Sequence, residues 1–198
     1  RVDGSCADGV LGFALVTPDG QVREVTPDGA PEVFWASAGG MGLTGVIRRV
    51  TVQLRAIPTS RMVVDTERTA DLDDLLPRMS ARDDEYHYSV AWIDLVSRRH
   101  RGRSVLTRGD HAEPGALSPI ARRDLHAYDP APLATVPPVV PTGLLNLATV
   151  SAFNEAWYRR HPVHRTGEVQ SIPAFFHPLD GVHHWNRIYG RRGFLQYQ

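Results

Sequence analysis

Four glycines stand within seven residues, from Gly39 to Gly45, in this chain of 198 residues. Gly40, Gly42 and Gly45 have the G-x-G-x-x-G spacing of dinucleotide-binding turns. Such a turn follows a strand and opens a helix, whereas here a short helix is expected before the glycines and a strand after them, so we exclude it. The glycines still allow positive φ and a close approach of the backbone to a phosphate or the edge of a flat cofactor ring. A tight connector that binds nothing is the equal alternative.

Three polar side chains and one indole have types that could position a ligand. Gln196 and Gln198 lie two apart in an expected strand, so both amides point to one face and could bond hydroxyl groups. Arg187 could hold a phosphate through two parallel hydrogen bonds, and Trp92 could wall an apolar pocket. The alternatives are a solvated polar face for the glutamines, a surface cation for Arg187 and ordinary core for Trp92.

Other chemistries find no support in the sequence. His183 and His184 are adjacent and would face opposite ways on a strand, and neither they with His177 nor the segment His161–His164 has the ligand spacing of a metal site, so no metal is expected. No Gly-x-Ser-x-Gly nucleophile elbow is present. All 22 basic residues are arginine, which removes lysine as a Schiff base or general base. Cys6 is the only cysteine, which excludes an internal disulfide.

Charge is balanced, with 22 basic and 22 acidic residues, so no overall field favours nucleic acid. The densest basic group is Arg98, Arg99, Arg101 and Arg103, which we expect in a solvated loop. Peripheral contact of this group with an anionic membrane is a weaker hypothesis. No stretch approaches about 18 consecutive apolar residues, so no transmembrane segment is expected, and the location stays open between cytoplasm and cell envelope.

Hydrophobic patterning predicts an α+β fold in two parts. The first part has a hairpin over Gly12–Val25, turning at Pro18-Asp19-Gly20, then a short helix over Pro31–Ala36 and a strand over Val46–Leu54. Pro58 stops that strand, and we place a domain boundary there, giving residues 1–57 and 58–198.

The second part is predicted to hold an antiparallel sheet with helices. The expected strands are Arg61–Thr66, Tyr86–Val96 paired with Ser104–Thr107, Val169–Phe176 and Phe194–Tyr197. The expected helices are Asp71–Met79, capped by Thr69, and Phe153–Arg160. Residues 129–141 hold five prolines and are expected to form an extended connector.

The segment Phe34–Ile47 resembles the one that closes the FAD-binding domain in flavoproteins of the vanillyl-alcohol-oxidase type. Within that superfamily the chain is most similar to the family of decaprenylphosphoryl-ribose 2'-oxidases. The resemblance continues, in family order and at family-like spacing, in Tyr88–Trp92, Phe176–Asp180, Trp185–Arg187 and Gly193–Gln198. It implies the end of a PCMH-type FAD-binding domain in residues 1–57. It also implies a substrate-binding (cap) domain, incomplete at its C-terminus, in residues 58–198.

The resemblance also implies an activity. Members of the family bind FAD non-covalently and remove a hydride from the C2 hydroxyl carbon of a ribose that is joined through phosphate to a polyprenyl lipid. A partner reductase then acts on the keto sugar, and the pair epimerises ribose to arabinose for cell-wall arabinan. By position, Ile47 would meet the adenine end of FAD through its backbone, beside the expected cofactor contacts Gly40, Gly42 and Gly45. The expected substrate contacts are Trp92, Phe176, Arg187, Gln196 and Gln198.

The chain departs from the family pattern at two positions, with Gly9 where the family has His and Phe176 where it has Tyr. The flavin phosphate loop is expected upstream of Arg1, and the active-site Lys and Cys downstream of Gln198. No catalytic residue is therefore assigned, and these residues alone are expected to be inactive. An oxidase of a soluble sugar or aldonolactone, and an inactive remnant of the family, are the alternatives.

Overall fold

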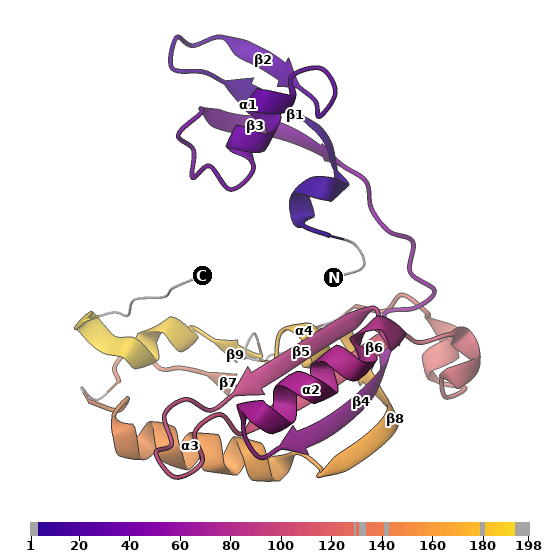
Figure 1. The fold of residues 1–198 in the computed structure, drawn as a ribbon, viewed down its shortest axis with the longest axis vertical. Coiled ribbons are helices and arrows are strands. Elements are labelled where there is room, and N and C mark those ends of the chain that lie inside the picture. Colours follow the sequence, from indigo (N-terminus) through magenta and orange to yellow (C-terminus); the bar gives the residue numbers. More distant parts are fainter. Residues whose placement is uncertain (1–3, 129, 131–133, 141–142, 179–180, 193–198) are drawn as a thin grey trace. The chain divides into compact units, whose positions relative to one another are not determined.

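The structure, a computed structural model, describes residues 4–128, 130, 134–140, 143–178 and 181–192 (Figure 1). The chain divides into two compact units, Arg1–Ala56 and Ile57–Gln198. Each unit combines helices with an antiparallel sheet, as the predicted α+β class requires. The roles of the two units, FAD binding and substrate binding, stay predictions.

The first unit is a three-stranded antiparallel sheet in the order β2-β1-β3 with one short α-helix beside it. The predicted hairpin is confirmed: the Thr17 N–H donates to the Gln21 carbonyl at 2.9 Å, and Gly20 takes the positive φ that the turn requires. The Phe13 and Phe34 rings stack at 5.3 Å and centre the core. The elements are η1 Cys6–Gly9, β1 Val10–Val16, β2 Val22–Val25, α1 Pro31–Ser37 and β3 Val46–Val52.

The second unit is a four-stranded antiparallel sheet in the order β5-β6-β4-β8, with a separate parallel pair, β7-β9. The predicted pairing of the segment Ser104–Thr107 with the preceding strand is confirmed, and it continues to Gly109. The sheet strands are β4 Arg61–Thr69, β5 Tyr88–Ile93, β6 Ser104–His111 and β8 His164–Ser171, and the short pair is β7 Ala134–Thr135 and β9 Val182–His183.

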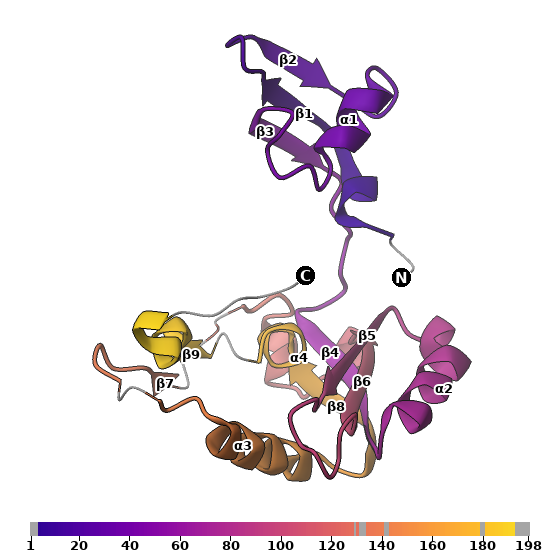
Figure 2. The same cartoon turned by 60° about the vertical axis from the view of Figure 1, so that its left-hand side comes forward.

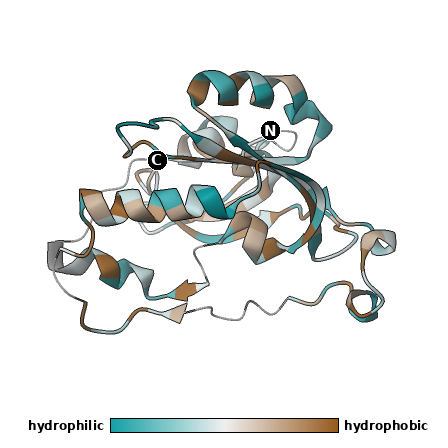
Figure 3. Ribbon diagram, turned by 90° about the horizontal axis from the view of Figure 1, so that it is seen from below, coloured by the Kyte–Doolittle hydropathy of each residue, from teal (hydrophilic) through white to brown (hydrophobic). Residues whose placement is uncertain are grey.

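Helices cover both faces of this sheet. Helix α2 (Leu72–Arg82) lies on one side, while α3 (Leu147–Arg160) and α4 (Ile172–Phe176) lie on the other (Figure 2). Hydrophilic and hydrophobic residues alternate along α2 and α3, as they do in helices that bury one face (Figure 3). The remaining turns of 3₁₀ helix are η2 Asp83–Glu85, η3 Pro114–Ala116, η4 Ala121–Arg123 and η5 Trp185–Arg192.

Two local predictions are wrong. The segment Val169–Phe176 is not one strand, because β8 ends at Ser171, whose hydroxyl accepts the Ala174 N–H, and Pro173 sits in the first turn of α4. Thr69 does not cap α2, because it ends β4 with its side chain buried, and the Asp71 carboxylate accepts the Asp74 N–H instead. The predicted strand Phe194–Tyr197 lies outside the described residues.

Candidate functional site

A cavity of about 450 Å³ opens on the face of the second unit's sheet that α3 and α4 cover. Strand pairing decides which side chains reach it. Thr66 pairs with Thr107 and Trp92 pairs with Val105, so residues from β4, β5 and β6 share this face. The turn from α3 into β8 closes one side of the cavity, and α4 closes another.

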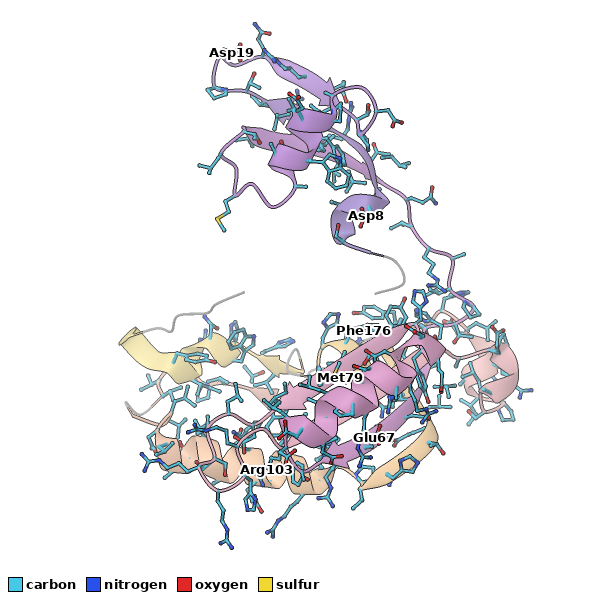
Figure 4. All side chains as sticks on the ribbon, viewed as in Figure 1. Asp8, Asp19, Glu67, Met79, Arg103 and Phe176 are labelled. Atoms are coloured by element: carbon cyan, nitrogen blue, oxygen red, sulfur yellow. The ribbon has the colours of Figure 1, made fainter. Side chains whose placement is uncertain are left out.

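Aromatic rings form most of the apolar wall. Trp92 comes from β5, Trp157 from α3, and Phe175 and Phe176 from α4. The Phe176 ring, labelled in Figure 4, meets the Tyr88 ring edge to face at 4.9 Å and the Phe175 ring at 4.7 Å. It is therefore held from two sides. Flat rings of this kind are suited to the apolar face of a sugar or to a hydrocarbon chain.

Polar groups gather where α3 passes into β8. Arg160, His161 and Arg165 line the cavity together with Glu168, which accepts a hydrogen bond from Arg165 at 3.1 Å. The Trp157 indole N–H is buried and has no hydrogen-bond partner among the described residues. The cavity therefore combines an aromatic wall with two arginines and an indole N–H, unpartnered in the described structure, at one side.

A buried polar network holds α3 in place beside the cavity. Asp94 accepts hydrogen bonds from the Asn154 amide of α3 at 2.7 Å and from the Arg103 guanidinium at 3.0 Å. Arg103, labelled in Figure 4, also pairs with Glu155. Burial acts to raise the pKa of Asp94, but the hydrogen bonds from the Ser97 N–H and from Asn154 hold it below its ordinary value. Asp94 therefore stays ionised and fixes the helix to the β5–β6 hairpin.

That network corrects one interpretation from the sequence. Arg103 is 4% exposed and is held by two carboxylates, so it does not belong to a solvated basic loop. Arg98, Arg99 and Arg101 are exposed, as predicted.

The predicted substrate residues do not all meet. Trp92 and Phe176 come from distant segments and line the same cavity. Arg187 lies in η5, where its Nη1 donates to the Val136 carbonyl at 3.0 Å, and it is not among the described residues that line the cavity. Gln196 and Gln198 lie outside the described residues.

The glycine loop of the first unit has two structural glycines. A Cβ at Gly40 would overlap the Ala36 carbonyl oxygen, and one at Gly45 would overlap the Val16 carbonyl oxygen. The close approach that these two glycines allow is therefore to the chain's own backbone. Gly42 differs, because it has φ +77° and no side chain or backbone nearer than 3.8 Å to an added Cβ.

Ile47 lies at a separate apolar hollow of about 550 Å³ in the first unit. Its side chain is 48% exposed, and the hollow is lined also by Phe34, Trp35 and Gly39. An open apolar surface beside a glycine-rich turn fits a flat ring system such as adenine. Of the four predicted cofactor residues, Ile47 lines the hollow, Gly42 has open space around it outside the hollow lining, and Gly40 and Gly45 are explained by the fold.

Sequence reasoning missed Trp157, Arg160 and Arg165. For the two arginines a signal exists in the basic segment Arg159–Arg165, which holds four arginines or histidines beside Arg165, whereas nothing near Trp157 marks it as a cavity residue. Within the described part of the chain, no group of three or more His, Cys, Asp or Glu side chains is arranged to hold a metal ion.

Comparison with known proteins relates the chain to oxidases, while no protein-family model matches it. It is 38% identical over 198 residues to the decaprenylphosphoryl-beta-D-ribose oxidase of Mycolicibacterium smegmatis, a match that covers 98% of this chain and 43% of that protein. It is 36% identical over 191 residues to an uncharacterized protein in the mprA 5' region of Streptomyces coelicolor, covering 91% of this chain and 51% of that one.

A third relative matches a much shorter part of the chain. Over 55 residues, 28% of this chain and 12% of the relative, the chain is 42% identical to the (R)-6-hydroxynicotine oxidase of Paenarthrobacter nicotinovorans. These similarities confirm the resemblance inferred from the motifs: the chain is a homologue of the decaprenylphosphoryl-ribose oxidases. It spans about half or less of the length of the relatives that it matches. In the described residues, no helix has the length and apolar character needed to cross a membrane.

Proposed function

We propose that the protein is an FAD-dependent oxidoreductase that oxidises the ribose of a polyprenyl-phosphate sugar. In this proposal residues 1–57 end a PCMH-type FAD-binding domain and residues 58–198 bind the substrate. The sequence identity of 38% over 98% of the chain supports the family, and the oxidase relatives support a flavin. Bound non-covalently, FAD would supply the chemistry by accepting a hydride from the sugar.

The aromatic cavity is the observation that carries the proposal. It brings Trp92 and Phe176, two residues that the family resemblance assigns to the substrate, onto one surface. Their rings give a sugar an apolar face to lie on, and they exclude water from it. The work of these residues is to bind and orient the sugar. Gly42 and Ile47 of the first unit are the residues suited to contact the cofactor.

We also propose two partners for the complete protein, a reductase and a membrane surface. A reductase that acts on the keto sugar would complete the epimerisation of ribose to arabinose. Peripheral contact with an anionic membrane would bring the enzyme to a lipid substrate, and the exposed arginines Arg98, Arg99 and Arg101 are the residues suited to it. Replacing these three by Ala should weaken binding to vesicles of anionic lipid. Unchanged binding would contradict the proposed membrane contact.

The proposal is tested on the protein encoded by the complete reading frame. Purified protein should carry the absorbance of oxidised flavin, and a polyprenyl-phosphate ribose should bleach it in the absence of oxygen. If only soluble sugars or aldonolactones bleach the flavin, the substrate is one of these and not a polyprenyl-phosphate sugar. Flavin that no sugar reduces would favour an inactive relative, and a protein without flavin would contradict the proposal.

A further inference from the structure

We propose that Arg160 and Arg165 form a binding site for the phosphate of an anionic amphiphile whose apolar part lies on the aromatic wall of the cavity. The inference deepens the proposed function and rests on it for the assignment of this cavity to the substrate. It gives the phosphate to the turn between α3 and β8 instead of to Arg187.

The first step compares Arg160 with nearby arginines that have carboxylate partners. Arg103 is buried and paired with Asp94 and Glu155, and Arg159 pairs with Glu155 at 2.5 Å. Arg160 is exposed and lines the cavity, and its guanidinium has no hydrogen-bond or ion-pair partner among the residues that the structure describes, so only solvent competes with a ligand for it. An unpaired guanidinium at a cavity wall is a group that a ligand can satisfy.

The second step is the charge of the cavity. Arg160 and Arg165 contribute two positive charges, and Glu168 contributes one negative charge through its contact with Arg165. The Trp157 N–H adds a donor without a partner in the described residues. These side chains therefore give the lining a net positive charge, which favours a ligand that brings negatively charged acceptors. The planar fork of arginine suits the oxygens of a phosphate.

The third step is the apolar wall, which distinguishes the ligand from a free anion. Trp92 and Phe176 offer ring surface on the same cavity as the two arginines. Inorganic phosphate would leave that surface in water, whereas an alkyl or prenyl phosphate would cover it. Arg187, the phosphate ligand predicted from the sequence, already donates to the Val136 carbonyl and does not line this wall in the described structure.

The test uses the 198-residue chain and its tryptophan fluorescence, with farnesyl phosphate and the neutral alcohol farnesol as probes. We expect the phosphate to bind at least about tenfold more tightly than the alcohol. Arg160→Ala and Arg165→Ala should each remove most of that preference, and Glu168→Gln should increase it. Arg159→Ala is the matched control, because Arg159 is the neighbour of Arg160 on α3 and is engaged by Glu155.

Each other outcome would overturn the inference. Equal binding of phosphate and alcohol, or a preference that survives both substitutions, would leave the arginines without this role. An equal loss in Arg159→Ala would show only diffuse attraction by the basic segment, and a loss confined to Arg187→Ala would return the phosphate to η5. Inorganic phosphate that competes as strongly as farnesyl phosphate would show a site for the free anion.

The failure of the inference is distinguishable from the failure of the proposed function. Binding here needs neither flavin nor turnover. If the complete protein oxidises the polyprenyl-phosphate sugar while the two arginine variants keep the wild-type KM, the inference alone fails. If the phosphate preference holds but no sugar reduces the flavin, the proposed function alone fails.

Discussion

The two faces of the four-stranded sheet use the same residue types in opposite ways. On the face under α2, Glu67 (labelled in Figure 4) pairs with the buried Arg108 and with Arg78 of the helix, so these charges have partners within the protein. On the face toward α3 and α4, Arg103 and Arg165 also have carboxylate partners, but Arg160 is unpaired in the described structure and a cavity remains. Arginine, glutamate and aromatic rings thus close one face and leave the other open to a ligand.

The largest effect is expected from breaking the closed face. Glu67→Ala would leave the guanidinium of Arg108 buried without its carboxylate, and removing one partner of a buried ion pair costs about 3–5 kcal/mol of the free energy of unfolding. Urea denaturation measures the loss. Glu85→Ala is the control, because the Glu85–Arg82 pair is about half exposed and should contribute less than about 1 kcal/mol. Equal losses would contradict the description of this face as a closed network.

A smaller effect should follow at the network that holds α3 beside the open face. Asp94→Asn would weaken charge-assisted hydrogen bonds to Arg103 and Asn154, at a cost of about 1.5–3 kcal/mol at neutral pH. The folded-state pKa of Asp94 is lowered, so its contribution is present above the unfolded pKa of about 3.9 and is lost as the pH falls through the folded value.

The pH dependence supplies the measurement for Asp94. Free energies of unfolding at pH 7 and pH 3 should differ less in Asp94→Asn than in the wild type. Asp84→Asn, at an exposed position, is the control and should keep the wild-type difference. An unchanged difference in Asp94→Asn would show that this carboxylate does not link stability to pH.

The outcome at Arg103 shows why local sequence did not predict this network. The run Arg98–Arg103 has the composition of a solvated loop, and three of its four arginines are exposed. The partners of Arg103 are Asp94 and Glu155, which lie 9 and 52 residues away in the sequence. The pattern of neighbouring residues carries no information on contacts at such separations. The sequence therefore could not predict that Arg103, of these four arginines, is buried.

Elements with local signals were predictable. The alternation of β3 and the Pro-Asp-Gly turn predicted strand and hairpin, because both depend on neighbouring residues. In the segment Val169–Phe176 the prediction of one strand was wrong although a local signal for a helix was present. That signal is Ser171 as a capping residue followed two residues later by Pro173. Trp92 and Phe176 line one cavity, and only the family resemblance predicted that they would act together, because no local sequence pattern connects them.

A further prediction concerns Tyr86, which edges the closed face. Its hydroxyl donates to Asp65 at 2.6 Å, and burial, followed by the Asp65 hydrogen bond and charge, raises the pKa of Tyr86 to about 12. The neutral phenol stabilises the fold below the unfolded pKa of about 10, and this contribution is lost as the pH rises from about 10 to about 12. Tyr86→Phe should cost about 1 kcal/mol at neutral pH.

Alkaline titration of tyrosine absorbance checks this prediction. The wild type should show a component that ionises near pH 12, and Tyr86→Phe should lack it. Tyr158→Phe is the matched control and should retain it. A component that persists without Tyr86 would assign the raised pKa to another tyrosine.

The smallest effect is expected at Phe176 on the open face, where a hydroxyl can project into the cavity without losing packing. Phe176→Tyr restores the residue type of the family at a half-buried position and should change the free energy of unfolding by less than about 0.5 kcal/mol. Phe175→Tyr is the matched comparison. Phe175 also borders the cavity, but it is only 5% exposed and packs against Met62 and Val64, so a hydroxyl buried there without a partner costs about 1–3 kcal/mol. Denaturation of both variants measures the difference between neighbours on one helical turn. Equal costs would mean that the cavity face is packed as tightly as the core, and that the surface assigned to the ligand is not available to one.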